Sequence, residues 1–207
     1  GGGFSLGKSA ETILFTRKPT LGGRPYTSSL ESGFFRGVLT HFQWHKWQGL
    51  GFISCILRDA NQLAPDSLGV VSVSSLQTSG FHRTASEIAD KKALLESNLG
   101  GGISYQSELS RVGILLQYTT FDKPLSKANK TYNQYEFAGT QNLLLSFYYN
   151  YTLSFAQVFG EITRSSSGGI GSVFGVLGSL SRRWDMSLLF RKFTPNFHSF
   201  YGNAFSE

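Results

Sequence analysis

The first residues of the chain match the pattern of a phosphate-binding loop. Gly2–Ser9, "GGFSLGKS", fits G-x-x-x-x-G-K-[ST], in which backbone N–H groups wrap a phosphate chain. Lys8 would reach the terminal phosphates and Ser9 would hold Mg²⁺. Such a loop works only between a buried strand and a helix whose N-terminus faces the anion. Only Gly1 precedes the motif, and the chain lacks the strand–helix alternation of nucleotide folds. We therefore interpret the match as chance, with a strand end running into a loop at Lys8.

Other residues with catalytic or metal-binding chemistry are dispersed. His41 and His45 have the spacing of metal ligands on a helix, but their segment alternates like a strand, which would separate them by about 13 Å. Cys55 lies among apolar residues and is expected to be an inert filler. Nothing brings together two carboxylates for acid–base catalysis among Glu136, Glu161 and Asp185. The sequence therefore predicts a non-enzymatic protein without catalytic, metal-binding or cofactor-binding residues.

The composition favours short strands and tight turns. Charged residues make up 15% of the 207 residues, against about 25% in typical globular domains, whereas there are 24 glycines and 14% aromatic residues. The single cysteine excludes an internal disulfide. The net charge of +6 is scattered along the chain, so we expect no nucleic-acid partner, although a basic surface could meet anionic lipid headgroups. No apolar run approaches the ~20 residues of a transmembrane helix.

Alternation of apolar and polar residues with a period of two dominates the chain. In Arg111–Phe121, "RVGILLQYTTF", the residues Val112, Ile114, Leu116 and Tyr118 share one side. Trp184–Phe193, "WDMSLLFRKF", repeats the pattern. Further strand-like segments are Phe34–Lys46, Leu50–Asp59, Leu99–Ser107, Asn142–Asn150, Thr152–Thr163 and Gly169–Leu180.

Short and long connections alternate between these segments. Short turns are predicted at Trp47–Gly49, Glu108–Ser110, Asn150–Thr152 and Ser181–Arg183. Longer polar stretches cover Lys8–Gly33, Ala60–Asn98 and Phe121–Gln141. This alternation is typical of outer-membrane barrels, which have tight periplasmic turns and long outer loops. Aromatic residues near predicted strand ends agree with an interfacial girdle: Trp44, Trp47, Tyr149, Tyr151 and Trp184.

One helix is predicted inside the longest connection. Thr84–Glu87, "TASE", is a capping box, and the following residues run without Gly or Pro to Leu95. His82 and Arg83 directly precede the cap and are candidate recognition residues for an anionic group or another loop. Alternatively, they only pin the loop through local hydrogen bonds.

On a barrel strand, alternate side chains face either the lipid or the lumen. A charge facing lipid at the midplane costs about 2–4 kcal/mol for Arg or Lys, so polar residues of apolar strands should face the lumen. The candidate lumen-facing residues are Arg36, Arg58, Gln117, Glu161, Asp185 and Arg191. The expected lipid-facing residues are Ile114, Leu116, Leu145, Phe147, Leu188 and Phe190. The lumen-facing charges would either line a channel or brace the wall.

The chain contains the phrases "FFRG", "SSLQTSGFHRTASEIADK", "YNQYEFAG", "FGE" and "YGNAFSE", at Phe34–Gly37, Ser74–Lys91, Tyr132–Gly139, Phe159–Glu161 and Tyr201–Glu207. Together they resemble a family of Bacteroidota outer-membrane proteins described as helix-hairpin-helix domain-containing proteins. The resemblance extends over essentially the whole chain and implies a large β-barrel that follows a small N-terminal domain. The helix-hairpin-helix part is absent here, so its DNA contacts do not transfer, and no catalytic or ligand residues come with the resemblance.

We therefore expect an all-β fold, an antiparallel up-and-down transmembrane β-barrel segment with one short helix in a long loop. Residues 1–207 would form a single segment of a larger barrel in the bacterial outer membrane, acting as a pore, a transport conduit or a scaffold for surface loops. Its partners would be outer-membrane lipid and either other envelope proteins or a translocated solute. The alternative is a soluble secreted all-β domain that binds carbohydrate or protein. A barrel exposes apolar side chains and tolerates a polar interior, whereas a soluble sandwich does the reverse.

Overall fold

The computed structural model describes residues 34–65, 67, 69–77, 82–126, 133–181 and 184–201. The glycine-rich motif Gly2–Ser9 and the polar stretch Lys8–Gly33 lie outside these residues. The described elements, in chain order, are β1 (Gly37–Trp44), β2 (Trp47–Arg58), β3 (Ala60–Gln62), β4 (Val73–Leu76), α2 (Ala85–Ala89), β5 (Leu94–Gln106), β6 (Ser110–Leu125), β7 (Gly139–Thr152), β8 (Ala156–Ser165), β9 (Ile170–Ser181) and β10 (Trp184–Phe193).

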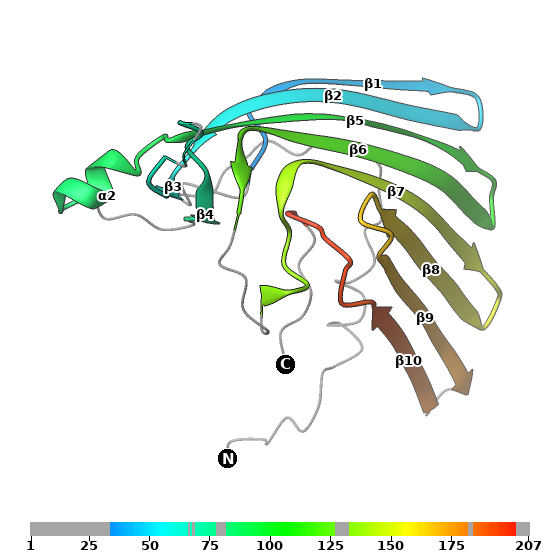
Figure 1. Cartoon of the computed structure of the whole chain (residues 1–207). Coiled ribbons are helices and arrows are strands. Elements are labelled where there is room, and N and C mark those ends of the chain that lie inside the picture. The colour runs from blue at the N-terminus through cyan, green and yellow to red at the C-terminus, as the bar shows by residue number, and fades with distance from the viewer. Residues whose placement is uncertain are drawn as a thin grey trace, which may run out of the picture.

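The strands form one ten-stranded sheet in which chain neighbours lie next to one another. Its main path runs β1-β2-β5-β6-β7-β8-β9-β10, and every pairing along this path is antiparallel. Figure 1 shows these strands side by side in a curved sheet, with β3, β4 and α2 beyond one end. The predicted all-β, antiparallel up-and-down fold is confirmed. Within the described residues the sheet is open, with β1 and β10 at its edges.

The two ends of the sheet differ in their connections. Short turns at 45–46, 107–109 and 153–155 lie at one end, which we call the turn end. The connections 59–93, 126–138 and 166–169 lie at the other, the loop end. The observed strands overlap all the predicted ones, and β10 has the predicted bounds. No helix among the described residues is long and apolar enough to span a membrane.

Two predicted turns are displaced by strands that continue further than expected. The prediction at Trp47–Gly49 is wrong because His45, with a φ of 53°, already reverses the chain and Trp47 pairs with Trp44. The prediction at Asn150–Thr152 is wrong because β7 continues to Thr152, which pairs with Gln157. Aromatic and β-branched residues favour extended backbone, so both strands continue up to the turn.

The capping box is present, but the helix is shorter than predicted. The Thr84 hydroxyl accepts the Glu87 N–H, and the Glu87 carboxylate accepts the Thr84 N–H. The helix ends at Ala89, and Lys92 adopts a φ of 52° that takes the chain out of helical geometry. Leu94, the first residue of β5, is fully buried and pairs with Arg58 of β2, so tertiary packing overrides the helical propensity of "KKALL".

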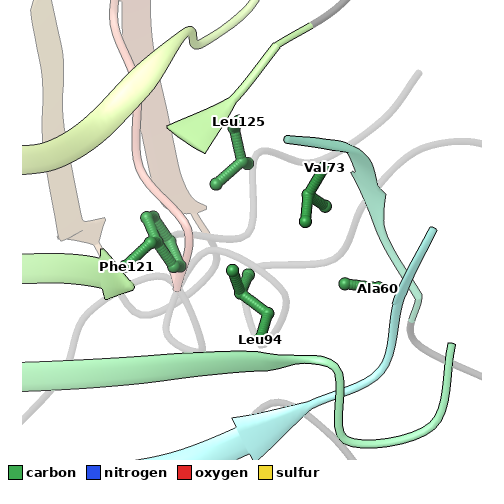
Figure 2. Packing of buried hydrophobic residues seen from close by; sticks show 5 residues of the cluster. All are labelled: Ala60, Val73, Leu94, Phe121 and Leu125. Carbon is green, nitrogen blue, oxygen red and sulfur yellow. The ribbon is translucent and has the colours of Figure 1, made fainter. Parts of the chain in front are cut away.

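A small hydrophobic cluster closes the loop end. Ala60, Val73, Leu94, Phe121 and Leu125 are all buried and converge from β3, β4, β5 and β6, as Figure 2 shows. Leu76 of β4 packs against this cluster, as do Phe137 and Phe200 from two further segments. Burying each large side chain stabilises the fold by about 1.5–3 kcal/mol. The connections at the loop end are therefore anchored to the strands.

Glycines allow large rings to lie flat across neighbouring strands. The Phe52 ring covers Gly100, the Tyr148 ring covers Gly113 and the Phe159 ring covers Gly175. A Cβ at any of these glycines would lie 2.2–2.5 Å from a ring atom or hydroxyl of that neighbour. Such aromatic–glycine pairs fix the register of a curved sheet.

We predict that Gly102→Ala destabilises the sheet, whereas Gly51→Ala does not. A Cβ at Gly102 would lie 2.4 Å from Leu115 Cδ2 and 2.7 Å from the Ile114 carbonyl oxygen. The closest atom to a Cβ at Gly51 is Thr40 Oγ1 at 3.6 Å. Overpacking costs about 1–3 kcal/mol, so Gly102→Ala should lower the urea midpoint. Equal midpoints for the two variants would contradict the observed packing.

Candidate functional site

The two faces of the sheet carry different chemistry. One row of cross-strand partners joins Ile53, Leu99, Tyr118 and Leu143 across β2, β5, β6 and β7. The adjacent row, displaced by one residue, joins Ser54, Asn98, Thr119 and Asn142. Successive side chains in a strand point to opposite sides. The first row therefore belongs to an apolar face and the second to a polar face.

The apolar face is the exposed one. Leu99 is 54% exposed, Leu145 50% and Leu188 58%. The same face carries the exposed residues Val38, Ile53, Leu57, Ile103, Val112, Ile114, Leu116, Leu143, Phe147, Ile162, Phe174 and Phe190. Contiguous apolar patches larger than a few hundred Å² mark interaction surfaces, and this one extends over the whole main path of the sheet.

All six residues expected to face lipid lie together on the apolar face. Ile114 pairs with Phe147, and Leu116 pairs with Leu145. Phe190 on β10 pairs with Phe174 on β9, which lies on the same face. Leu188 lies two residues from Phe190 on the same face. Gln117, Asp185 and Arg191 fall on the polar face by the same alternation.

Exposed aromatic side chains gather at the turn end. Trp44 pairs with Trp47, and the Trp47 ring meets Tyr105 edge-on with centroids 5.2 Å apart. Tyr151 near the end of β7 and Trp184 at the start of β10 extend this row, and both are exposed. Four of the five predicted girdle residues, the three tryptophans and Tyr151, therefore lie at a single end of the sheet.

The polar face is the better-buried one. Nine polar or charged side chains are buried among the described residues, against eight hydrophobic ones. Soluble domains bury mainly apolar residues and almost never bury a charged one without a partner. Among the described residues, buried side chains are therefore polar and hydrophobic in nearly equal number, while the exposed face is lined by apolar ones.

Glu96 is the centre of a hydrogen-bond network on the polar face. Its carboxylate accepts Arg58 Nη1 at 3.2 Å and Asn98 Nδ2 at 2.6 Å, and it also accepts the Tyr201 hydroxyl. The Asn98 side-chain oxygen in turn accepts Thr119 Oγ1 at 2.6 Å and Gln117 Nε2 at 3.2 Å. The network joins β2, β5 and β6 to the end of the described chain.

The Arg58–Glu96 pair brings two opposite charges together where water scarcely reaches, although Arg58 Nε has no hydrogen-bond partner among the described residues. The side chains are 9% and 1% exposed, respectively. Removing one partner of a buried pair costs about 3–5 kcal/mol because the other charge is left uncompensated. Burial raises the pKa of Tyr201, and its hydrogen bond to Glu96 raises it further. The phenol therefore stays protonated and donates to the carboxylate.

Residues 194–201, which we call the strap, lie on the concave side of the sheet (Figure 1). The Asn196 carbonyl oxygen accepts Ser167 Oγ at 2.5 Å, and the His198 carbonyl oxygen accepts Asn142 Nδ2 at 3.0 Å. Phe200 packs edge-on against Phe121, with centroids 5.2 Å apart. The strap thus crosses the polar face from β8 to β5.

The other candidate lumen-facing residues lie apart from the Glu96 network. Glu161 is exposed on the polar face and accepts Thr163 Oγ1 at 3.3 Å. Asp185 is also exposed and accepts Ser179 Oγ at 2.5 Å. Arg36 differs from the expected set. Arg36 directly precedes β1, and its carbonyl oxygen accepts the Cys55 N–H, so it lies opposite Cys55 on the apolar side. Its guanidinium lies 5.7 Å from the Phe34 ring centroid.

His82 and Arg83 both take part in local contacts of the loop. His82 Nε2 lies 2.7 Å from Asp59 Oδ2, which ties the residue before the helix to the end of β2. The Arg83 N–H donates to Glu87 Oε2 at 2.7 Å as part of the cap. These contacts agree with the pinning alternative for the backbone of this loop.

Asp59 is held in its charged form. Burial on its own raises the pKa of Asp59, but the Lys92 N–H, the His82 side chain and the charges of His82 and Lys91 together lower it below its ordinary value of 3.8. Both carboxylate oxygens are used, since Oδ1 accepts the Lys92 N–H at 2.8 Å. One carboxylate therefore fixes both ends of the 82–92 segment.

The residues considered as metal ligands or as a nucleophile, His41, His45 and Cys55, do not form a common site in the structure. Within the described part of the chain, no group of three or more His, Cys, Asp or Glu side chains is placed to hold a metal ion. His41 lies in β1 and His45 in the turn, so the two do not share a helical face. Cys55 is exposed on the apolar face, 3.6 Å from Ser97 Oγ.

Sequence reasoning missed the principal members of the polar network: Glu96, Asn98, Asn142 and Tyr201. The first two fell inside the predicted loop Ala60–Asn98, although the alternation of "LLESNLG" already has the period of a strand. Asn142 fell at the start of a predicted strand, but its role and that of Tyr201 carry no local signal because they depend on contacts with residues far away in the chain.

Comparison with known proteins gives no match: no family model matches the chain, and no curated protein or solved structure is significantly similar to it.

We predict that Asp59→Asn releases the 82–92 loop while the sheet stays folded. An amide cannot replace a carboxylate that accepts on both oxygens, so amide hydrogen exchange in 82–92 should become roughly tenfold faster. Because the pKa of Asp59 is lowered, wild-type docking should be complete above about pH 4 and lost as pH falls through the lowered value. Asp185→Asn at the turn end is the control and should leave this loop unchanged. Unchanged exchange in Asp59→Asn would contradict the pinning role.

Proposed function

We propose that this protein is part of the wall of a transmembrane outer-membrane β-barrel, with the apolar face toward lipid and the polar face toward the lumen. The role is non-enzymatic. The observation that carries the proposal is the inversion of the two faces, in which Leu, Ile and Phe are exposed while Arg58, Glu96 and Asn98 are buried. Lipid is the solvent in which that arrangement is favourable.

The dimensions of the apolar face support a bilayer. Apolar or aromatic residues follow one another from Leu143 to Tyr151 on one side of β7. Eight residue steps of a strand extend roughly 27 Å, and tilt shortens the span across the membrane toward the ~25 Å apolar band of known barrels. The tryptophans at the turn end would occupy one interface.

Of the roles expected for the inward charges, the geometry favours bracing at the loop end. Arg58 and Glu96 are buried against each other and the strap, so they stabilise the wall there. Glu161 and Asp185 are exposed on the polar face and remain available to a lumen. We propose a conduit or scaffold whose polar path is more open along β8 and β10 than beneath the strap. Membership of the Bacteroidota outer-membrane family follows from the motif resemblance and belongs to this proposal.

Tryptophan fluorescence tests the membrane placement directly. The chain contains three tryptophans, and all of them lie at the turn end, at the last residue of β1 and the first residues of β2 and β10. In phosphatidylcholine vesicles, lipids brominated near the carbonyl end of the acyl chain should quench emission more strongly than lipids brominated near the methyl end. Absence of quenching, as expected for a soluble carbohydrate-binding or protein-binding domain, would overturn the proposal.

A matched pair of substitutions on β10 tests which face meets lipid. Leu188→Arg places a charge on the apolar face, at a cost of up to about 2–4 kcal/mol in the hydrocarbon layer. Ser187→Arg places the same charge on the polar face. We expect Leu188→Arg to reduce the heat-modifiable, folded form in outer-membrane fractions, and Ser187→Arg to leave most of it. Equal loss in both variants would contradict the assignment of the faces.

A further inference from the structure

The strap is attached to the sheet differently from a strand. Thr194 still continues the ladder, donating its N–H to the Ile170 carbonyl oxygen at 2.9 Å. From Asn196 onward the strap's contacts with the sheet are made by side chains: Ser167 and Asn142 donate to strap carbonyl oxygens, and Tyr201 reaches Glu96. Such contacts can be broken without opening any strand pairing.

The strap covers only one half of the polar face. The side chains beneath it are nearly inaccessible, with Asn98 1%, Asn142 2% and Ser165 3% exposed. Farther from the strap on the same face, Glu161 in the middle of β8 and Asp185 near the start of β10 are exposed, whereas Ser104 near the turn end of β5 is 1% exposed. The concave side is therefore covered at the loop end and more open along β8 and β10.

The outer end of the strap is held by Tyr201 and Phe200, through both polar and ring contacts. The Tyr201 ring packs on Phe35, with centroids 4.4 Å apart, while its hydroxyl donates to Glu96. Phe200 packs into the loop-end cluster against Phe121 and Phe137. The segment itself, "TPNFHSFY", contains no Lys, Arg, Asp or Glu, so no charge pair of its own fixes it in place.

We propose that the strap is a gate that closes the loop end of the polar path, with Tyr201 as its latch on Glu96. This inference rests on the proposed barrel. In the latched state the strap blocks passage along the polar face. Release of Tyr201 and Phe200 swings residues 196–201 away and leaves the strand pairings intact, because the strap adds no strand to the sheet beyond Thr194.

The experiment compares Tyr201→Phe with Tyr148→Phe in the intact protein. Tyr148 lies on the same polar face over Gly113, away from the strap's attachment points, so the control makes the same chemical change there. Hydrogen exchange of 196–201 in lipid should become about tenfold faster in Tyr201→Phe, because a hydrogen bond to a charged group is lost. Potassium chloride conductance across a planar phosphatidylcholine bilayer should rise in the same variant. The control should match wild type in both measurements.

The outcomes separate the gate from the barrel itself. Faster exchange with unchanged conductance would overturn the gate, and unchanged exchange would overturn the latch. If Tyr201→Phe fails to assemble, Phe200→Ala decides, because it loosens the strap without touching the Glu96 network. Failure of both variants to assemble would make the strap a folding element and overturn the gate. Failure of the wild-type protein to enter bilayers would instead overturn the proposed barrel.

Discussion

The alternation of side chains in an extended strand is the constraint on which this protein depends. Each strand sends every second residue to the opposite face, and the cross-strand register places most of the apolar residues of β1 to β10 on one face, although Arg164 lies opposite Leu145 there. A slip of one residue in any pairing would move charges such as Glu96 onto the apolar face. Bulky rings seated over glycines, such as Phe52 on Gly100, oppose such a slip.

The second requirement follows from the first, because a polar face turned inward must satisfy its own hydrogen bonds. Glu96 meets this requirement by accepting from Arg58, Asn98 and Tyr201, and Asn98 passes the network on to Thr119. Buried polar networks are costly wherever a member lacks a partner, and Arg58 Nε is one such atom. The strap adds the Tyr201 hydroxyl to the partners of Glu96 as well as covering the wall.

The sequence was sufficient for the features that repeat locally. Period-two alternation located the strands, and "TASE" located the helix start, because both signals lie within a few residues of one another. The helix end was missed since the burial of Leu94 and its pairing with Arg58 depend on tertiary packing. The Glu96–Tyr201 contact could not be predicted from the sequence for the same reason. Arg36 lies on the apolar side and not on the predicted lumen-facing side, because the face of a strand's first residues depends on where pairing begins.

The separation in sequence between contacting residues differs sharply between sheet and strap. Each step along the main path joins strands that are consecutive in the chain, apart from β2 and β5, which enclose the loop with β3, β4 and α2. Tyr201 and Glu96 are 105 residues apart. Closing a loop of that length carries an entropic cost that a hairpin does not, so distant contacts form after local ones. The strap can dock only once β5 and β6 have created its binding surface, and its protection therefore marks the completion of folding.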